Sequence, residues 1–311
     1  RIYIINIVVT NNIIYFIYFI YFIYFIYYMK YKLIGIYILI VFILLLFSKN
    51  KTTYAIHTVF ILKENILFLE EWIKYHIHIG FDNFYLYDNT GSKHQEWNII
   101  INKTNKYGIN YDKYINDEQI EKKFKDILNK YKNHIIYIKW QPKNENGEIK
   151  YGQSESINHY IKKYKKDNEW TAFIDMDEFI YMKNHKSIKD FINEKKNYNK
   201  IIMDMKNFDD RFLHVNKSIF DIDNSIKHQD IFFGWGRKNI CKNSDLINTN
   251  IIHNIKVNNE KQYNPNNIDE IRFNHYNVNK KTIEWMKGYF KKNNFEVEKD
   301  NSMKRFKNII N

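Results

Sequence analysis

Three carboxylates crowd together near the middle of the chain: Asp175, Asp177 and Glu178. They directly follow residues 170–174, a short apolar run with aromatic and β-branched side chains that predicts a buried strand. Acids at the end of a buried strand are costly unless a cation neutralises them. A hard divalent cation bound to a phosphate would do so, because Mg²⁺ and Mn²⁺ prefer oxygen ligands. We therefore interpret Asp175 and Asp177 as a metal–diphosphate site of the Asp-x-Asp type.

An Asp-x-Asp triplet is a weak signal by itself, and the chain contains a second one at Asp221 and Asp223. No apolar strand precedes the second copy, so a solvated turn is the better interpretation there. For the first copy, composition leaves both a metal site and a capped loop open. His275 could add an imidazole to a metal, although a lone histidine beside an aromatic residue is more often packed and hydrogen-bonded to backbone.

Several catalytic signatures are absent from the sequence. The chain has no Gly-rich phosphate loop, no nucleophile elbow and no His-Glu-x-x-His. A nucleotide would therefore have to be bound through a metal and side chains. The single cysteine, Cys241, excludes an intramolecular disulfide and a cysteine-based zinc site.

The elements that would position the acids begin with a strand, a helix and a second strand at residues 54–62, 67–79 and 84–87. This order predicts a parallel pair with a right-handed crossover. Ligands of such sheets gather at the carboxyl ends of the strands. Lys63 and Glu64 follow the first strand and Asp88 follows the second, so we expect them at the same edge as Asp175 and Asp177.

The rest of the chain continues the α/β pattern without a Pro-, Gly- or Ser-rich linker, which predicts one domain over residues 53–311. Residues 208–253 show no regular pattern. We expect Glu178 to point away from Asp177, since adjacent strand residues face opposite sides. The remaining predictions are helices at 93–106, 117–130, 153–165, 187–194 and 282–292 and strands at 134–140, 200–205 and 270–276.

The N-terminus is apolar. Residues 1–28 contain no acid and carry an Ile-Tyr-Phe repeat, and the first methionine is Met29. Residues 29–52 read as a basic flank, fifteen apolar residues and a second basic flank. Without a small-residue cleavage pattern, they predict a retained signal anchor. Residues 1–28 are either translated upstream sequence or a first membrane span.

The anchor predicts a single-pass membrane protein. Its short apolar segment suits the thin membranes of the early secretory pathway, so we expect a Golgi- or ER-type membrane and a lumenal catalytic domain. The net charge of +13 suits membranes or nucleotide diphosphates. No Lys/Arg block is interleaved with aromatic residues, so we expect no nucleic-acid partner.

Over residues 54–290 the chain resembles glycosyltransferase family 92 and related family-2-like glycosyltransferases. The resemblance rests on stretches in matching order: residues 63–76, 80–82 and 85–89, residues 173–179 with Gln153 upstream, residues 238–242 with His253, and Asn274-His275-Tyr276. It implies a GT-A fold, a UDP-sugar donor, a glycan or glycoprotein acceptor, and a divalent metal, usually Mn²⁺, with Mg²⁺ as the alternative.

The resemblance also implies roles for single residues. Asp177 would be a metal ligand, and Asp175 would contact the metal or the ribose. His275 would be a further ligand or a diphosphate contact. The expected nucleotide contacts are Asp88 at the nucleoside, with Lys63 and Glu64 beside it, and Lys238 and Lys242 at the leaving diphosphate.

The chain departs from the family pattern in two places. The usual Lys-Asn-Glu reads Lys63-Glu64-Asn65, and the acceptor-facing segment differs over residues 203–210. An inverting transfer needs a carboxylate base, for which Asp210 and then Asp209 are the candidates. Two other functions stay open: a metal-dependent phosphoesterase or nucleotidyltransferase, and an inactive membrane-tethered glycan-binding relative.

Overall fold

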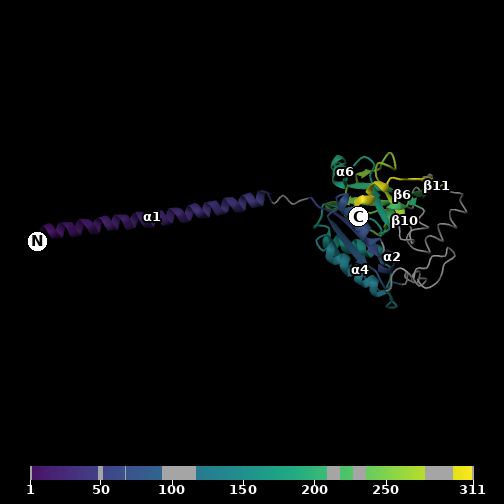
Figure 1. Cartoon of the computed structure of the whole chain (residues 1–311), viewed down its shortest axis with the longest axis horizontal. Coiled ribbons are helices and arrows are strands. Elements are labelled where there is room, and N and C mark those ends of the chain that lie inside the picture. Colours follow the sequence, from purple (N-terminus) through teal and green to yellow (C-terminus); the bar gives the residue numbers. More distant parts are fainter. Residues whose placement is uncertain are drawn as a thin grey trace. The chain divides into compact units, whose positions relative to one another are not determined.

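The computed structural model describes residues 2–47, 52–66, 68–92, 117–208, 218–226, 236–276 and 297–309. The chain forms two units, Arg1–Thr52 and Thr53–Asn311. The first consists mainly of one helix, α1 (Ile2–Phe47), which runs without interruption through the repeat and the apolar segment of the expected anchor (Figure 1).

Helix α1 contains a segment that could cross a membrane by length and composition. This segment is Phe16–Ile38, 23 residues long. At 1.5 Å per residue it measures about 35 Å, enough for a hydrocarbon core of roughly 30 Å.

The second unit is built on a curled, mixed sheet flanked by helices, which confirms the expected GT-A architecture. Within the described residues the sheet has eleven strands, ordered β11-β7-β6-β8-β4-β1-β2-β3; β9 and β10 also pair with β6, and β5 pairs with β10. The strands are β1 (Tyr54–Phe60), β2 (Asn83–Asp88), β3 (Ile135–Lys139), β4 (Trp170–Phe173), β5 (Glu178–Tyr181), β6 (Lys200–Phe208), β7 (Asn224–Ile226), β8 (Lys238–Lys242), β9 (Gln262–Tyr263), β10 (Arg272–Tyr276) and β11 (Val297–Lys299).

The helices that the structure describes in this unit are short. They are α2 (Leu62–Asn65), α3 (Leu69–His78), α4 (Asp117–Lys130), α5 (Gln153–Tyr164) and α6 (Ile188–Glu194), with 3₁₀ turns η4 (Ile219–Asp221), η6 (Asn243–Asp245) and η7 (Lys304–Ile309). The predicted helices at 93–106 and 282–292 lie outside the described residues.

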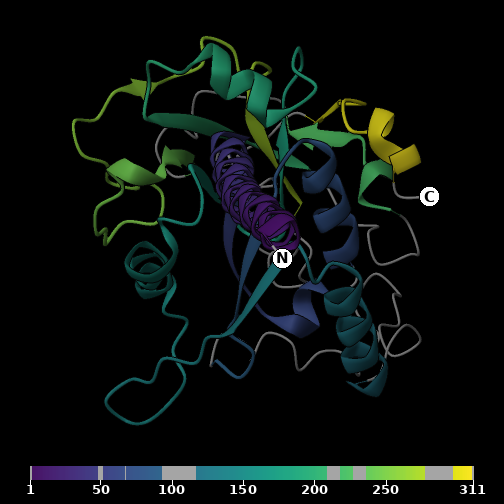
Figure 2. The same cartoon turned by 90° about the vertical axis from the view of Figure 1, so that its left-hand side faces the viewer.

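Strands β1, β2, β3 and β4 are parallel neighbours, as the strand–helix–strand order predicts. Alternate side chains of β1 and β2 enter two hydrophobic clusters, one shared with α3 and α4 and one shared with α5. Figure 2 shows α5 on one side of these strands and α3 and α4 on the other. Helices on both faces explain why all seven residues of β1 are buried.

The sequence pattern did not predict five of the described strands, namely β5, β7, β8, β9 and β11, and two of these contribute to the site. Strand β8 lies in the stretch expected to be irregular, where it pairs antiparallel with both β4 and β6. Its sequence, Lys-Asn-Ile-Cys-Lys, carries too little apolar alternation to be recognised, and its burial comes from its two neighbours. Strand β5 begins at Glu178, so Asp175 and Asp177 lie in a turn between two strands and do not simply end one.

Candidate active site

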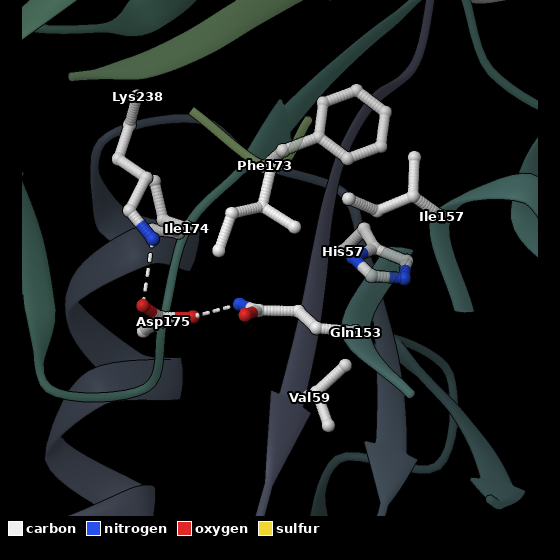
Figure 3. A pocket seen from close by; sticks show the side chains of 9 residues that line it. His57, Val59, Gln153, Ile157, Phe173, Ile174, Asp175 and Lys238 are labelled. Carbon is white, nitrogen blue, oxygen red and sulfur yellow. Dashed lines mark hydrogen bonds and ion pairs between the residues drawn. The ribbon is translucent and has the colours of Figure 1, made fainter. Parts of the chain in front are cut away.

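The turn after β4 places Asp175 between two donors. Its Oδ1 accepts a hydrogen bond from Gln153 Nε2 at 2.8 Å, and its Oδ2 accepts one from Lys238 Nζ at 2.6 Å. Figure 3 shows both contacts, with Gln153 reaching in from α5 and Lys238 from β8. Both carboxylate oxygens therefore hold protein contacts in this structure, although the side chain remains 30% exposed.

Glu178 does not point away from the acids, so that prediction is wrong. Its side chain is buried, its Oε2 accepts the backbone N–H of Asp175 at 2.8 Å, and the same oxygen lies 3.4 Å from Lys238 Nζ. The turn between β4 and β5 brings the Glu178 carboxylate to the backbone N–H of Asp175. The alternation of strand residues does not apply, because residues 174–177 are not in a strand.

Lys238 supplies the positive charge beside Asp175 and Glu178. Burial opposes its charge, but attraction to Asp175 and Glu178 outweighs that cost and raises its pKa. Burial also disfavours the ionised form of Asp175, yet Lys238 reverses the effect and lowers its pKa. For Glu178 burial wins over Lys238 and raises the pKa to about 7. At neutral pH the Asp175–Lys238 pair is therefore charged, and Glu178 is close to the midpoint of its titration.

Asp177 contacts His275 next to the cluster of Asp175, Glu178 and Lys238. Asp177 Oδ2 lies 3.3 Å from His275 Nε2, and Asp177 O accepts the backbone N–H of Tyr276 at 2.9 Å. Strand β10 brings the imidazole there by pairing with β5 and β6, opposite Glu178 and Asn207. Burial disfavours the charged imidazole, but Asp177 more than compensates and raises its pKa to about 9.

The Asp177–His275 pair fits a divalent cation. Two neighbouring ligands of an octahedral ion with bonds near 2.1 Å lie about 3 Å apart, close to the observed 3.3 Å. His275 Nδ1–H can donate to Asn207 Oδ1 at 3.1 Å, which would leave Nε2 as the ligand atom once a cation displaces the proton that Asp177 stabilises on it. The described residues contain no group of three His, Cys, Asp or Glu side chains that could hold a metal, so diphosphate and water oxygens would have to complete the shell.

Asp88 lies at the same edge of the sheet, at the end of β2. Its Oδ1 accepts the Thr90 N–H at 2.9 Å and its Oδ2 accepts the Tyr137 hydroxyl at 2.8 Å. Strand β1 separates β2 from β4, so Asp88 and Asp175 are about two strand spacings apart, roughly 10 Å.

The other residues expected at this edge have different outcomes. Lys63 pairs with Asp117 at the start of α4, with 2.8 Å between Nζ and Oδ1, and is not part of the Asp175 cluster. Glu64 belongs to α2, but its side chain lies outside what the structure describes. Asp209 and Asp210 also lie outside the described residues.

Lys242 lies at the wrong end of its strand to bind a diphosphate. It is opposite Trp170, at the start of β4, whereas Lys238 reaches Asp175 beyond the end of β4. Four residues of extended strand separate the two lysines by about 13 Å. The expectation that both lysines face the diphosphate is corrected here, and only Lys238 lies at the site.

Sequence reasoning missed two residues that orient the acids and the imidazole. Gln153 was noted only for its place in a family resemblance, and its bond to Asp175 depends on the packing of α5. Asn207 lies beyond the predicted end of β6, so its contact with His275 could not be expected. The second Asp-x-Asp instead forms ion pairs with the C-terminal segment, Asp221 with Lys307 and Asp223 with Lys299 and Lys304.

Comparison with known proteins identifies the class to which this fold and site belong. The family model of glycosyltransferase family 92 matches residues 104–309, about two thirds of the chain. The chain belongs to glycosyltransferase family 92, and this family supports a glycosyltransferase activity. The matched range contains Asp175, Asp177, Lys238 and His275, and it begins after Lys63 and Asp88.

Other comparisons add little. No curated protein matches the sequence. Among solved structures, the chain is similar to "The Crystal Structure of UDP-glucose pyrophosphorylase complexed with UDP-glucose", at 12% identity and a TM-score of 0.29, covering 78% of this chain and 99% of that chain. At that TM-score the similarity carries no argument.

Proposed function

We propose that this protein transfers a hexose from a UDP-sugar to a glycan or glycoprotein acceptor, with inversion, and that it requires Mn²⁺ or Mg²⁺. The observation that supports this most is the pairing of Asp177 Oδ2 with His275 Nε2 beside the buried Asp175–Lys238 pair. A carboxylate, an imidazole and a fixed cation then lie together at the carboxyl edge of the sheet, where α/β proteins bind their ligands.

Each residue has a distinct part in the proposed reaction. Asp177 and His275 would hold the metal, which would supply positive charge to the leaving diphosphate. Lys238 adds a positive charge that is already in place, and a fixed charge costs no reorganisation during the reaction. Asp88 contacts the nucleoside, and the acceptor hydroxyl loses its proton to a carboxylate, for which Asp210 and Asp209 remain the candidates.

The proposal is tested by a donor screen on the detergent-solubilised full chain. UDP-galactose, UDP-glucose, UDP-GlcNAc and GDP-sugars are each supplied with Mn²⁺, and release of nucleotide is measured with and without acceptor glycans. We expect metal-dependent release of UDP from one UDP-sugar. Release of UMP would contradict the proposal, and so would the absence of nucleotide release from every donor.

Asp177→Ala should lower this activity roughly 100-fold or more, since a catalytic metal contributes several kcal/mol. Asp221→Ala is the matched control, because Asp221 also belongs to an Asp-x-Asp triplet but pairs with Lys307 at the surface. If both variants kept full metal-dependent activity, the assignment of the site would be wrong.

A further inference from the structure

The unit that carries the candidate active site also contains a polar hollow away from that site. It lies between residues 183–185, which link β5 to α6, Glu194 at the end of α6, and the segment 267–270 before β10. Its volume is about 570 Å³, and small-molecule sites span roughly 300–1,000 Å³. The hollow is therefore large enough for a ligand, and the proposed function makes no use of it.

The hollow lies at the opposite end of the β5–β10 pair from the proposed metal site. The two strands are antiparallel, with Glu178 opposite His275 at one end and Tyr181 opposite Arg272 at the other. The walls of the hollow continue from the second end, whereas Asp177 precedes the first. Three residues of extended strand separate the two ends by about 10 Å. A ligand in the hollow would therefore not touch the proposed metal.

Contacts between the wall segments fix the shape of the hollow. The backbone N–H of Lys183 donates to Asp269 O at 3.1 Å, which joins the two segments. The backbone N–H of Asp269 donates to Asn267 Oδ1 at 2.8 Å. His185 Nε2 lies 2.8 Å from Glu194 Oε2, which ties the first segment to the end of α6. The hollow is therefore formed in the free protein.

The charged side chains of the hollow neutralise one another. Three carboxylates and three cations pair within and beside its walls: Asp269 with Lys183 and Arg272, and Glu194 and Glu270 with Lys195. Opposite charges are thus present in equal number, so a ligand would not have to offset a net charge.

This wall chemistry limits the class of ligand. The described residues contain no group of three His, Cys, Asp or Glu side chains that could hold a metal ion, which argues against a cation. An anion would lie against three carboxylates whose partner cations are already engaged, and like charges in contact are unfavourable. An apolar ligand would remove water from charged groups without replacing their hydrogen bonds. A neutral ligand rich in hydrogen-bonding groups fits best.

Two exposed amides are available to bind such a ligand. Among the residues that the structure describes, Asn184 has no hydrogen-bond partner, and Asn267 uses its Oδ1 but not its Nδ2. An amide both donates and accepts hydrogen bonds, and an ion-paired carboxylate keeps unused lone pairs. A sugar hydroxyl likewise donates and accepts. A sugar could therefore bind these groups without breaking the ion pairs of the wall.

We propose that this hollow is a second, non-catalytic site that binds a neutral oligosaccharide. The proposal goes beyond the proposed function, because the ligand would touch neither the nucleotide nor the metal. It suits a member of a glycosyltransferase family, whose acceptor in the proposed function is a glycan.

Isothermal titration of the full chain with oligosaccharides, without nucleotide or metal, tests the proposal. The chain is kept in a detergent without a sugar head group, since such a head group would compete. The neutral probes are maltotriose, chitotriose and N-acetyllactosamine, and a hyaluronan tetrasaccharide is the anionic probe. We expect at least one neutral probe to bind, and to bind more tightly than the anionic one. Binding of no neutral probe, or tighter binding of the anionic probe, would overturn the proposal.

A double variant locates the bound sugar. Asn184→Leu removes one amide, and Asn267→Asp removes the amide donors but keeps the oxygen that accepts from Asp269 N. Their combination should weaken binding by about tenfold or more. Asn248→Leu with Asn146→Asp is the matched control, because all four asparagines are exposed and these two lie outside the hollow. Equal affinities for the two double variants would overturn the proposal.

The same variants separate this proposal from the proposed function. Asp177→Ala should leave oligosaccharide binding unchanged, and the Asn184/Asn267 double variant should keep release of UDP from the donor in the absence of acceptor. Loss of oligosaccharide binding in Asp177→Ala would place the sugar at the active site and overturn the second site. Failure of the donor screen would contradict the proposed function alone, because oligosaccharide binding is measured without donor.

Discussion

At the scale of single residues, Lys238 decides whether the acids of the central turn can coexist. Its side chain is only 4% exposed, and it lies within 3.4 Å of both Asp175 and Glu178. A buried ion pair adds little net stability, but removing one partner leaves an uncompensated charge. Lys238 is therefore needed for folding as well as for the proposed chemistry.

Lys238→Met should destabilise the protein by about 3 kcal/mol, because it leaves the buried Glu178 and the partly buried Asp175 without a cation. Denaturant unfolding of the full chain measures the difference. Lys242→Met, at the other end of the same strand, is the control and should change stability by no more than about 0.5 kcal/mol. Equal midpoints for the two variants would show that the cluster does not depend on Lys238.

The sequence predicted those site residues that are marked by a pattern in their own stretch of chain. Asp175 and Asp177 follow an apolar run, and that pattern was sufficient to place them at the edge of the sheet. The direction of Glu178 and the contacts of Gln153 and Asn207 depend on how separate elements pack. A single sequence contains no signal for such contacts.

At the scale of elements, β10 is the strand that assembles the site, and a buried ionic network holds it. Arg272 pairs with Asp269 and with Asp300, its guanidinium lies 4.3 Å from the Tyr181 ring centroid, and Lys206 also reaches Asp300 at 2.7 Å. These contacts join β10 to β5, β6 and the segment after β11. His275 is carried on the same strand, so the network also fixes its position.

Asp300→Asn should destabilise the protein by about 1.5–3 kcal/mol at neutral pH, since charge-assisted hydrogen bonds to Arg272 and Lys206 are lost. Burial disfavours ionisation of Asp300, but these partners prevail and lower its pKa to about 2. Its contribution is therefore present above pH 3.8 and is lost as the pH falls towards 2. Unfolding measured across this range should show the two proteins converging. A gap that stayed constant down to pH 2 would contradict this account.

Gly152 sets the start of α5 and hence the position of Gln153. At its φ of +57° an added Cβ would also lie 2.5 Å from Pro142 Cγ. We expect Gly152→Ala to cost about 2–3 kcal/mol, from backbone strain and overpacking together. Gly147→Ala is the control, because Gly147 has φ +78° with nothing within 4 Å, and it should cost only about 1–2 kcal/mol. Thermal unfolding compares them, and equal losses would exclude the clash with Pro142.

Prediction of elements succeeded where the pattern was long and failed where burial comes from neighbours. The apolar run of β1 and the helical stripe of α3 gave a correct parallel unit. Strand β8 has only Ile240 and Cys241 as apolar residues, yet both are fully buried between β4 and β6. Its strand conformation is imposed by two partners that come from other parts of the chain.

At the scale of the whole molecule, the chain combines an apolar helix with a glycosyltransferase domain. The Phe16–Ile38 segment is long enough to cross a bilayer, which suggests a single-pass membrane anchor. We propose that the membrane is of the Golgi or ER type and that the glycosyltransferase domain lies on its lumenal side.

We expect the full chain to stay with membranes after alkaline carbonate extraction, because a spanning helix is not released by charge or pH. Fractionation of expressing cells measures this. Replacing Ile20, Ile23 and Ile26 together with lysine should release the protein, since each charge at the centre of a span costs roughly 2.5–3.5 kcal/mol. Retention of this variant would show that residues 16–38 are not the anchor.

The central claim is that Asp177 and His275 together hold the cation that binds the nucleotide. A crystal structure of the full chain with UDP and Mn²⁺, analysed by the anomalous signal of manganese, tests it most directly. We expect one manganese peak at coordination distance from both Asp177 Oδ2 and His275 Nε2, bridged to the diphosphate, with Lys238 nearby. UDP bound without such a peak, or with manganese held by other residues, would contradict the assignment.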